Sequence, residues 1–291
     1  MRPDFLCIGA QRGGTRWLYD QLVPHPQVWM PPIKEINFFT DRYRTAESPI
    51  PKRDTPVLPR VSKTTLSGRR NLKGTELSEA DRLFLQHALT FDSYSSNMDW
   101  YARLFEPKAG KLTGDISPSY ATLDKSTIAE IGHHFPDLGI IFLVREPIAR
   151  AWSQLSMRVR RGDISAEDLR DWSSIRRILD APEVAYQSHP VWTYTAWSAI
   201  FPPDRLFVGF FDDLCARPAW LKEQICNFLG IVFQGVADQR DPEFNAKANE
   251  RKFAMSDDVR DNMIAYFQEE RERCAHLFGG PAVAWMDLGR R

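Results

Sequence analysis

A glycine-rich segment near the N-terminus constrains the fold of this chain more than any other feature. It follows an apolar run at 5–8 and carries Gly9, Gly13 and Gly14 before a stretch of helical character that begins at Thr15. That order places a loop between a buried strand and the N-terminus of a helix, where backbone N–H groups and the helix dipole attract anions. The sequence therefore predicts a phosphate-binding loop inside an α/β fold.

The loop differs from the Walker A motif of nucleoside triphosphatases. Gly9 and Gly14 have the Walker spacing, but Thr15 and Arg16 stand where that motif has Lys and then Ser or Thr. The cation of this loop, Arg12, lies inside it instead. Because the Lys and the Mg²⁺-binding hydroxyl are both missing, the motif disfavours ATP hydrolysis and fits a phosphate that binds without a metal.

Strand and helix patterns alternate along the rest of the chain. Apolar runs predict strands at 139–144 and 206–211 and a shorter one at 28–30, whereas helical patterns cover 15–22, 126–135, 191–200, 219–229 and 257–277. The alternation predicts a P-loop-like, three-layer α/β fold with a central, mainly parallel sheet flanked by helices. We expect a single domain over 1–291, with an irregular insertion at about 41–75, where Pro, Arg, Lys and Ser are concentrated.

Charge and cysteine content disfavour several classes of protein. The 38 basic residues equal the 38 acidic ones in number, so no overall field attracts nucleic acid or a membrane surface. Neither the four cysteines nor the six histidines have the spacing of metal ligands, and a disulfide framework is equally disfavoured. No apolar run approaches the roughly 18 residues of a membrane span, and no signal-peptide pattern is present. We expect a cytoplasmic protein that needs no metal.

A second anion-binding pattern follows the strand at 139–144. Arg145 comes directly after the strand, Pro147 suits the first turn of a helix, and Ser153 lies about two turns farther along. Ligands of open α/β sheets bind beyond the carboxyl ends of the strands, and a guanidinium with a hydroxyl can hold a phosphate from two sides. An Arg after a strand is more often a surface ion pair, but the glycine-rich loop favours the phosphate interpretation.

Two further segments carry polar groups of interest. Lys34 and Glu35 lie between a pair of prolines and a pair of aromatics, Phe38 and Phe39. A carboxylate beside an apolar wall can act as a general base; the alternative is a solvated ion pair. The segment 114–120 either contributes strand-end residues to the same cleft or forms a turn around Pro118.

Together these motifs resemble those of the sulfotransferases that use 3′-phosphoadenosine 5′-phosphosulfate (PAPS), with the closer likeness to the bacterial and heparan-sulfate-type branch. The segment 9–16 is similar to that family's 5′-phosphosulfate loop, and 145–153 to its 3′-phosphate motif. The segment 34–39 resembles the Lys-Glu-x-x-Phe-Phe element that bears the catalytic glutamate. The resemblance extends over about residues 4–280, including 99–105, 211–214, 228–230 and 249–251.

The chain departs from the family pattern at some positions. Many members have Lys where Arg12 stands, and some have Lys where Ile116 stands. Arg keeps the charge and adds bidentate reach. The cytosolic small-molecule branch uses a catalytic histidine, but no histidine of this chain has a matching context, so Glu35 is the expected base.

The resemblance implies a PAPS-dependent enzyme that transfers a sulfuryl group to a hydroxyl or amine of an unidentified acceptor, expected to be a carbohydrate, a glycolipid or another small metabolite. Glu35, Lys34 and Arg12 are then catalytic, and PAPS is bound by Arg12, Gly13, Gly14, Thr15, Arg16, Arg145, Ser153 and Arg251. The alternatives are an atypical P-loop kinase, which would need Mg-ATP, and a non-enzymatic nucleotide-binding module. The basic segment 41–75 agrees with an acidic or glycan acceptor, and equally with a solvated surface.

Overall fold

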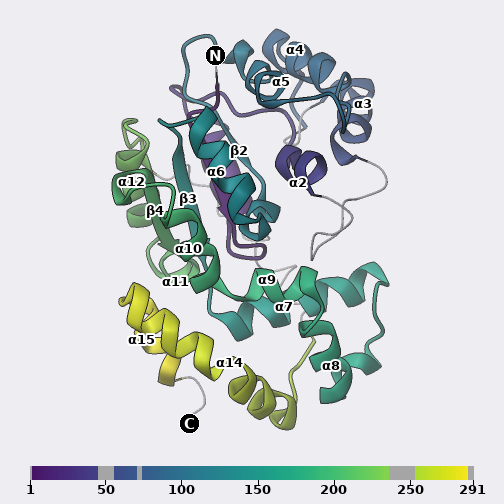
Figure 1. Ribbon diagram of the computed structural model, residues 1–291, viewed down its shortest axis with the longest axis vertical. Coiled ribbons are helices and arrows are strands. Elements are labelled where there is room, and N and C mark those ends of the chain that lie inside the picture. Colours follow the sequence, from purple (N-terminus) through teal and green to yellow (C-terminus); the bar gives the residue numbers. More distant parts are fainter. Residues whose placement is uncertain (1, 45–55, 71–73, 236–252, 288–291) are drawn as a thin grey trace.

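The computed structural model of the chain describes residues 2–44, 56–70, 74–235 and 253–287 (Figure 1). Within these ranges, a sheet of four parallel strands in the order β2-β1-β3-β4 lies between helices. The predicted α/β fold with a central parallel sheet flanked by helices is confirmed. The strands are β1 (Phe5–Gly9), β2 (Gly114–Ile116), β3 (Gly139–Val144) and β4 (Leu206–Phe210).

Helices account for most of the other described residues. The α-helices are α1 (Thr15–Leu22), α2 (Phe38–Tyr43), α3 (Val57–Gly68), α4 (Glu79–Ala88), α5 (Met98–Arg103), α6 (Lys125–His134), α7 (Pro147–Arg161), α8 (Trp172–Leu179), α9 (Pro182–Ser188), α10 (Pro190–Ser198), α11 (Phe211–Ala216), α12 (Pro218–Phe228), α14 (Asp257–Phe278) and α15 (Pro281–Ala284). Short 3₁₀ helices include η2 (Pro118–Thr122), which follows β2. None of the helices in the described ranges is both long and apolar enough to cross a membrane.

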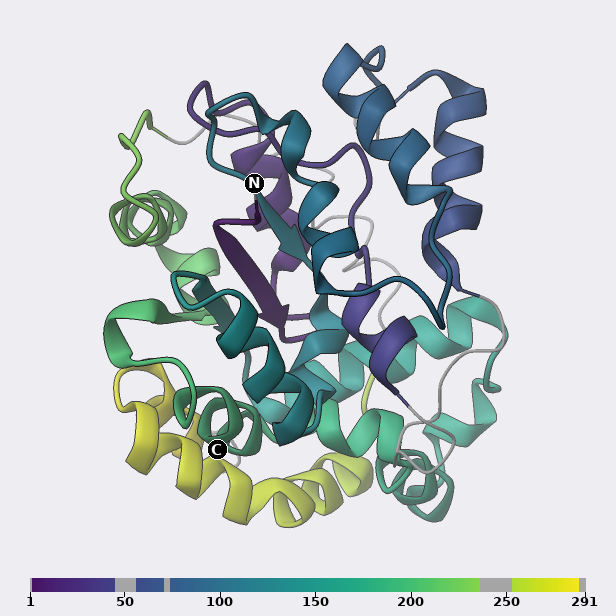
Figure 2. The same ribbon diagram turned by 45° about the horizontal axis from the view of Figure 1, so that its top comes forward.

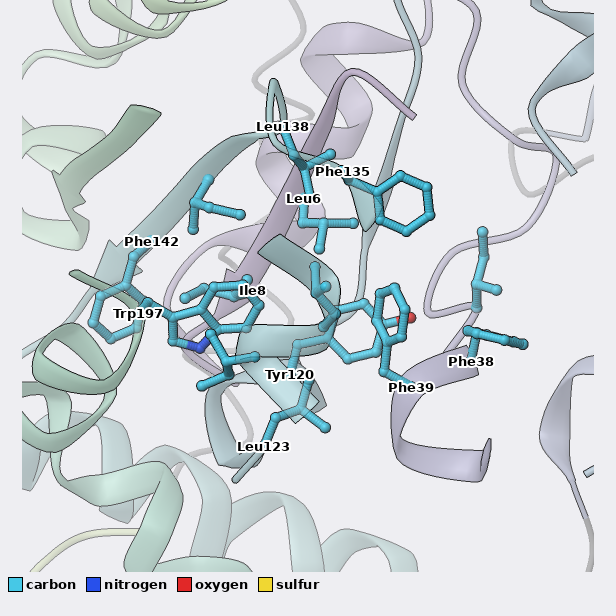
Figure 3. Packing of buried hydrophobic residues seen from close by; sticks show 14 of the residues in the cluster. Leu6, Ile8, Phe38, Phe39, Tyr120, Leu123, Phe135, Leu138, Phe142 and Trp197 are labelled. Carbon is cyan, nitrogen blue, oxygen red and sulfur yellow. The ribbon is translucent and has the colours of Figure 1, made fainter. Parts of the chain in front are cut away.

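The central strand β1 has two buried faces. Leu6 and Ile8 belong to one apolar cluster, which α6 and α10 also supply, whereas Phe5 and Cys7 belong to a second cluster with side chains of α1 and α12. Side chains alternate along a strand, so each layer of helices receives every second residue of β1. Figure 3 shows the first cluster. Figure 2 shows α14, in yellow-green, along the bottom of the view, and this helix contacts α7 and α10.

The strand predicted at 28–30 is wrong. Val28 makes only an isolated parallel bridge with Leu112. Pro31 and Pro32 follow directly, and because proline has no N–H group, the ladder cannot continue through them.

The prediction of an irregular segment at 41–75 is wrong for Val57–Gly68, which form helix α3. The prolines of this segment had suggested an irregular conformation. Pro56 is the N-cap and Pro59 lies in the first turn, where the backbone N–H groups need no partner within the helix. Leu58 is buried, and Val61 and Leu66 pack on the same cluster at helical spacing. Residues 45–55 and 71–73 lie outside the described residues.

Candidate functional site

The glycine-rich loop joins β1 to α1, as the sequence predicts. The N–H group of Ala10 donates to the carbonyl of Leu143 at 2.7 Å, which ties the loop to the end of β3. A Cβ atom at Gly13 would lie 2.5 Å from that same carbonyl oxygen, and Gly14, with φ 102°, has a conformation that side chains rarely adopt. The loop therefore needs glycine at both positions and presents its backbone at the N-terminus of α1.

The two predicted phosphate motifs meet at Arg12. Its Nε atom donates to Ser153 Oγ at 2.9 Å, and its carbonyl oxygen accepts from Arg145 Nη1 at 2.9 Å. The Arg145 guanidinium carbon lies 4.2 Å from the ring centroid of Phe211, so the aromatic face holds the guanidinium in place. The structure thus brings Arg12, Arg145 and Ser153 into one contiguous group at the carboxyl end of the sheet.

A third arginine, Arg150, belongs to the same region and was missed by the sequence reasoning. It is only 1% exposed, and its Nη2 atom donates to Gln154 Oε1 at 2.9 Å and to Ser188 Oγ at 2.5 Å. Its Nε and Nη1 atoms are buried without a partner, as is Nε of Arg145. Buried N–H groups in proteins usually have a hydrogen-bond partner, so these three groups are available to donate to an anion.

The sequence did contain a signal for Arg150. It lies three residues before Ser153 in the first turns of α7, and residues three apart share one face of a helix. A basic residue on the face that carries Ser153 could have been included in the anion site on that ground.

No carboxylate among the described residues lies within ion-pair distance of Arg12, Arg145 or Arg150. Burial lowers the pKa of each of these side chains, and neighbouring arginines lower it further. For Arg150 the pKa falls to about 9 because of burial and then of the charges on Arg145 and Arg12. Buried cations without a counter-charge are costly, so this cluster favours the binding of an anion.

The remaining predicted donor-site residues have different surroundings. Thr15 is buried in the first turn of α1. Arg16 has a half-exposed side chain, whose Nε atom donates to both carboxylate oxygens of Asp20 at 3.1 Å. Arg251 lies outside the described residues.

Residues 34–37 form a tight segment, here called the strap, beside the end of β2. Glu35 and Asn37 both have left-handed backbones, with φ 64° and 56°. The Glu35 N–H group donates to the carbonyl of Ile116 at 3.1 Å. Lys34 Nζ donates to Glu35 Oε1 at 3.0 Å, and the side chains are 9% and 53% exposed, respectively. The strap therefore presents the Glu35 carboxylate toward solvent with a cation on one of its oxygens.

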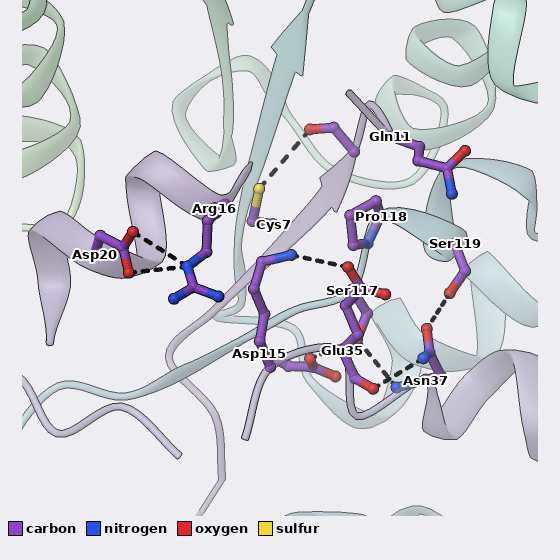
Figure 4. A network of polar contacts seen from close by, with 12 residues as sticks. Cys7, Gln11, Arg16, Asp20, Glu35, Asn37, Asp115, Ser117, Pro118 and Ser119 are labelled. Carbon is purple, nitrogen blue, oxygen red and sulfur yellow. Dashed lines mark hydrogen bonds and ion pairs between the residues drawn. The ribbon is translucent and has the colours of Figure 1, made fainter. Parts of the chain in front are cut away.

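The strap and the arginines occupy the same edge of the sheet. Because β1, β2 and β3 are parallel, their carboxyl ends lie together, with β1 in the middle. The phosphate loop follows β1, Arg145 follows β3, and the strap rests on the end of β2. Figure 4 shows Glu35 and Asn37 next to Ser117 and Ser119. Phe38 and Phe39, which follow the strap, are fully buried core residues and do not line the site.

The chain matches the sulfotransferase family over residues 3–235. No curated protein matches it. A sulfotransferase from Alicyclobacillus acidocaldarius has a similar structure, with a TM-score of 0.68, 23% identity and 100% of both chains covered. Sulfotransferase STF9 from Mycobacterium avium has a TM-score of 0.52 at 14% identity, over 96% of this chain and 77% of that one. The sulfotransferase domain of the Synechococcus PCC 7002 olefin synthase has a TM-score of 0.50 at 17% identity, over 100% and 95%. At these identities the structural likeness concerns the fold.

Proposed function

The chain belongs to the sulfotransferase family, and on that premise we propose that it transfers a sulfuryl group from PAPS to a hydroxyl or amine of an acceptor. PAPS has anionic groups at two ends, a 5′-phosphosulfate and a 3′-phosphate. The phosphate loop with Arg12 would hold the first, and Arg145 with Ser153 would hold the second. Gly13, Gly14 and Thr15 would add backbone N–H groups to the 5′ end, as helix N-termini do for phosphates.

The observation that carries this proposal is the group of three arginines without a carboxylate partner among the described residues. Arg145 Nε and two nitrogens of Arg150 are buried and orphaned. The hydrogen bond between Arg12 and Ser153 ties the loop to α7. A doubly charged phosphate supplies the missing acceptors and the missing counter-charge at once, so these residues fit the donor.

The chain's own residues account for the chemistry of transfer. PAPS would supply a sulfuryl group whose bond to the phosphate oxygen breaks as the acceptor oxygen or nitrogen bonds to sulfur, leaving adenosine 3′,5′-bisphosphate. Arg12 and the loop N–H groups would stabilise the negative charge that develops on the leaving phosphate. Glu35 would take the acceptor's proton on Oε2, to which no described residue donates, while Lys34 holds Oε1.

The acceptor is proposed to be a carbohydrate, a glycolipid or another small metabolite. The half-exposed carboxylate of Glu35 leaves room for an acceptor from solvent.

A thermal-shift titration in EDTA tests the donor site, with adenosine 3′,5′-bisphosphate in one series and ATP, with and without Mg²⁺, in the others. A ligand at about 100 times its Kd adds about 2.7 kcal/mol to the free energy of unfolding, which raises the Tm of a domain of this size by several degrees. We expect metal-free stabilisation by the bisphosphate well above that by ATP. Stabilisation by Mg-ATP alone would instead favour the kinase alternative, and no stabilisation by either would refute the donor site.

A further inference from the structure

Asp115 is a buried carboxylate held by hydroxyl groups and by the backbone N–H group of Ile36 in the strap, and not by a cation. It lies in β2, is 1% exposed, and forms no ion pair with any described residue. Its Oδ2 atom accepts from Tyr120 Oη at 2.6 Å and from Tyr101 Oη at 3.1 Å, and its Oδ1 atom accepts from Ser117 Oγ at 2.7 Å. Burying a carboxylate without a cation lowers the free energy of unfolding. A residue that is kept at such a cost beside the site is a candidate for a functional role.

The carboxylate fixes the orientation of the Ser117 hydroxyl. A serine hydroxyl has one hydrogen, and in Ser117 that hydrogen points to Asp115. The oxygen is then left as an acceptor, and it receives the backbone N–H group of Asn37 at 3.0 Å. Asp115 therefore determines that Ser117 accepts from the strap.

Asn37 passes this constraint to Glu35. Its Nδ2 atom donates to the carbonyl of Glu35 at 2.8 Å, and its Oδ1 atom accepts from Ser119 Oγ at 2.6 Å. The side-chain amide of Asn37 therefore connects Glu35, through its nitrogen, to Ser119, through its oxygen. With the Glu35 N–H group bound to Ile116, both backbone polar groups of Glu35 are engaged.

We propose that Asp115 is a positioning residue for Glu35, acting through Ser117 and Asn37. The proposal rests on the proposed role of Glu35 as general base. Left-handed backbones at Glu35 and Asn37 are strained for residues other than glycine and persist only where the surroundings fix them. The Asp115–Ser117–Asn37 chain provides that fixation and so sets where the carboxylate stands relative to the acceptor.

The test compares variants on and off this path. Ser117→Ala removes the acceptor for Asn37, and Asn37→Asp keeps the bond from Ser119 but replaces the donor to Glu35 by an oxygen. Tyr101→Phe is the matched control, because it removes a hydrogen bond to the same carboxylate without touching the strap. Turnover is measured as the hydrolysis of ³⁵S-labelled PAPS, followed by the release of labelled sulfate. Water replaces the acceptor in this assay, because it reaches the half-exposed carboxylate of Glu35. Affinity for adenosine 3′,5′-bisphosphate is measured in parallel.

We expect both on-path variants to lower kcat by about 10- to 100-fold with unchanged bisphosphate affinity, whereas Tyr101→Phe keeps the wild-type kcat. Amide hydrogen exchange of residues 35–37 should accelerate in Ser117→Ala and not in Tyr101→Phe. If Glu35→Gln is inactive but both on-path variants turn over like Tyr101→Phe, the positioning role is overturned alone. If Glu35→Gln turns over like the wild type, the proposed base is wrong, and the positioning role falls with it.

Discussion

Arg12 and Ser153, which are 141 positions apart in the sequence, are joined by a 2.9 Å hydrogen bond from Nε to Oγ. This bond links the phosphate loop to α7. It also pairs a cation with a hydroxyl, which is a weaker partner for a guanidinium than a phosphate would be. Because each side chain holds the other in place, the proposed 5′ site of Arg12 and the proposed 3′ site of Ser153 should not act independently.

The two residues should therefore be coupled in binding. We expect the effects of Arg12→Ala and Ser153→Ala on the affinity for adenosine 3′,5′-bisphosphate to be non-additive, with a coupling energy of about 0.5–3 kcal/mol. Isothermal titration calorimetry of the wild type, both single variants and the double variant measures it. The control pair is Arg12→Ala with Arg205→Ala, since Arg205 forms a surface ion pair with Asp137. Additive effects in both pairs would show that the hydrogen bond between Arg12 and Ser153 does not couple the two ends of the donor site.

Arg145 should contribute strongly to the affinity for the donor. Loss of a hydrogen bond to a charged group costs about 1.5–3 kcal/mol, so Arg145→Ala is expected to weaken bisphosphate binding by about 10- to 150-fold. Arg145→Lys should lose less, because Lys keeps the charge but lacks the planar fork. Calorimetry measures both. Arg205→Ala, which removes a surface ion pair with Asp137, is the control and should bind normally. An unchanged affinity in Arg145→Ala would contradict the assignment.

Arg150 should lower the free energy of unfolding of the free protein and raise its affinity for the bisphosphate. Its burial lowers its pKa to about 9, which leaves it charged at neutral pH, and the folded state bears the cost of an unpaired charge. Met is unbranched like the aliphatic part of Arg, so this replacement keeps that part of the packing and removes the charged guanidinium. We expect Arg150→Met to raise the free energy of unfolding by about 1–4 kcal/mol and to weaken bisphosphate binding. Urea unfolding and calorimetry measure the two effects; a variant that is less stable but binds normally would make Arg150 a structural residue only.

Much of the fold follows from local patterns in the sequence. The apolar runs at β1, β3 and β4 and the helices between them have the periodicities expected of an α/β sheet, and α14 begins after Ser256, whose side chain caps it as serine commonly does. The parallel topology then brings the ends of β1 and β3 together. The sequence could predict that Arg12, Arg145 and Ser153 lie at the same edge of the sheet. It could not predict the hydrogen bonds between them, because these depend on side-chain rotamers.

The misses have a different physical origin. Arg150 and Asp115 matter because they are charged, buried and without an opposite charge in ion-pair distance among the described residues, and burial of this kind depends on tertiary packing. In α3 the prolines occupy positions where a helix tolerates them, so composition alone pointed to the wrong conformation. The predicted role of Arg251 stays a prediction, because that residue lies outside the described ranges.

The buried charge of Asp115 should also be visible in the pH dependence of stability. Burial raises its pKa from 3.8 to about 6, against the lowering effect of the hydrogen bonds from Tyr120, Ser117 and Tyr101. The folded state therefore binds this proton more tightly than the unfolded state does, and the contribution of Asp115 to the free energy of unfolding decreases as the pH rises from about 4 to about 6.

Asp115→Asn removes this titration. We expect the free energy of unfolding of the wild type, minus that of Asp115→Asn, to fall as the pH rises through the window and to be level above it. Urea unfolding at several pH values between 4 and 8 measures the difference, with Tyr101→Phe as a control that keeps the carboxylate. A difference that does not change with pH would mean that Asp115 titrates alike in the folded and unfolded states, and a difference that rises with pH would mean that its charged form is stabilised by the fold.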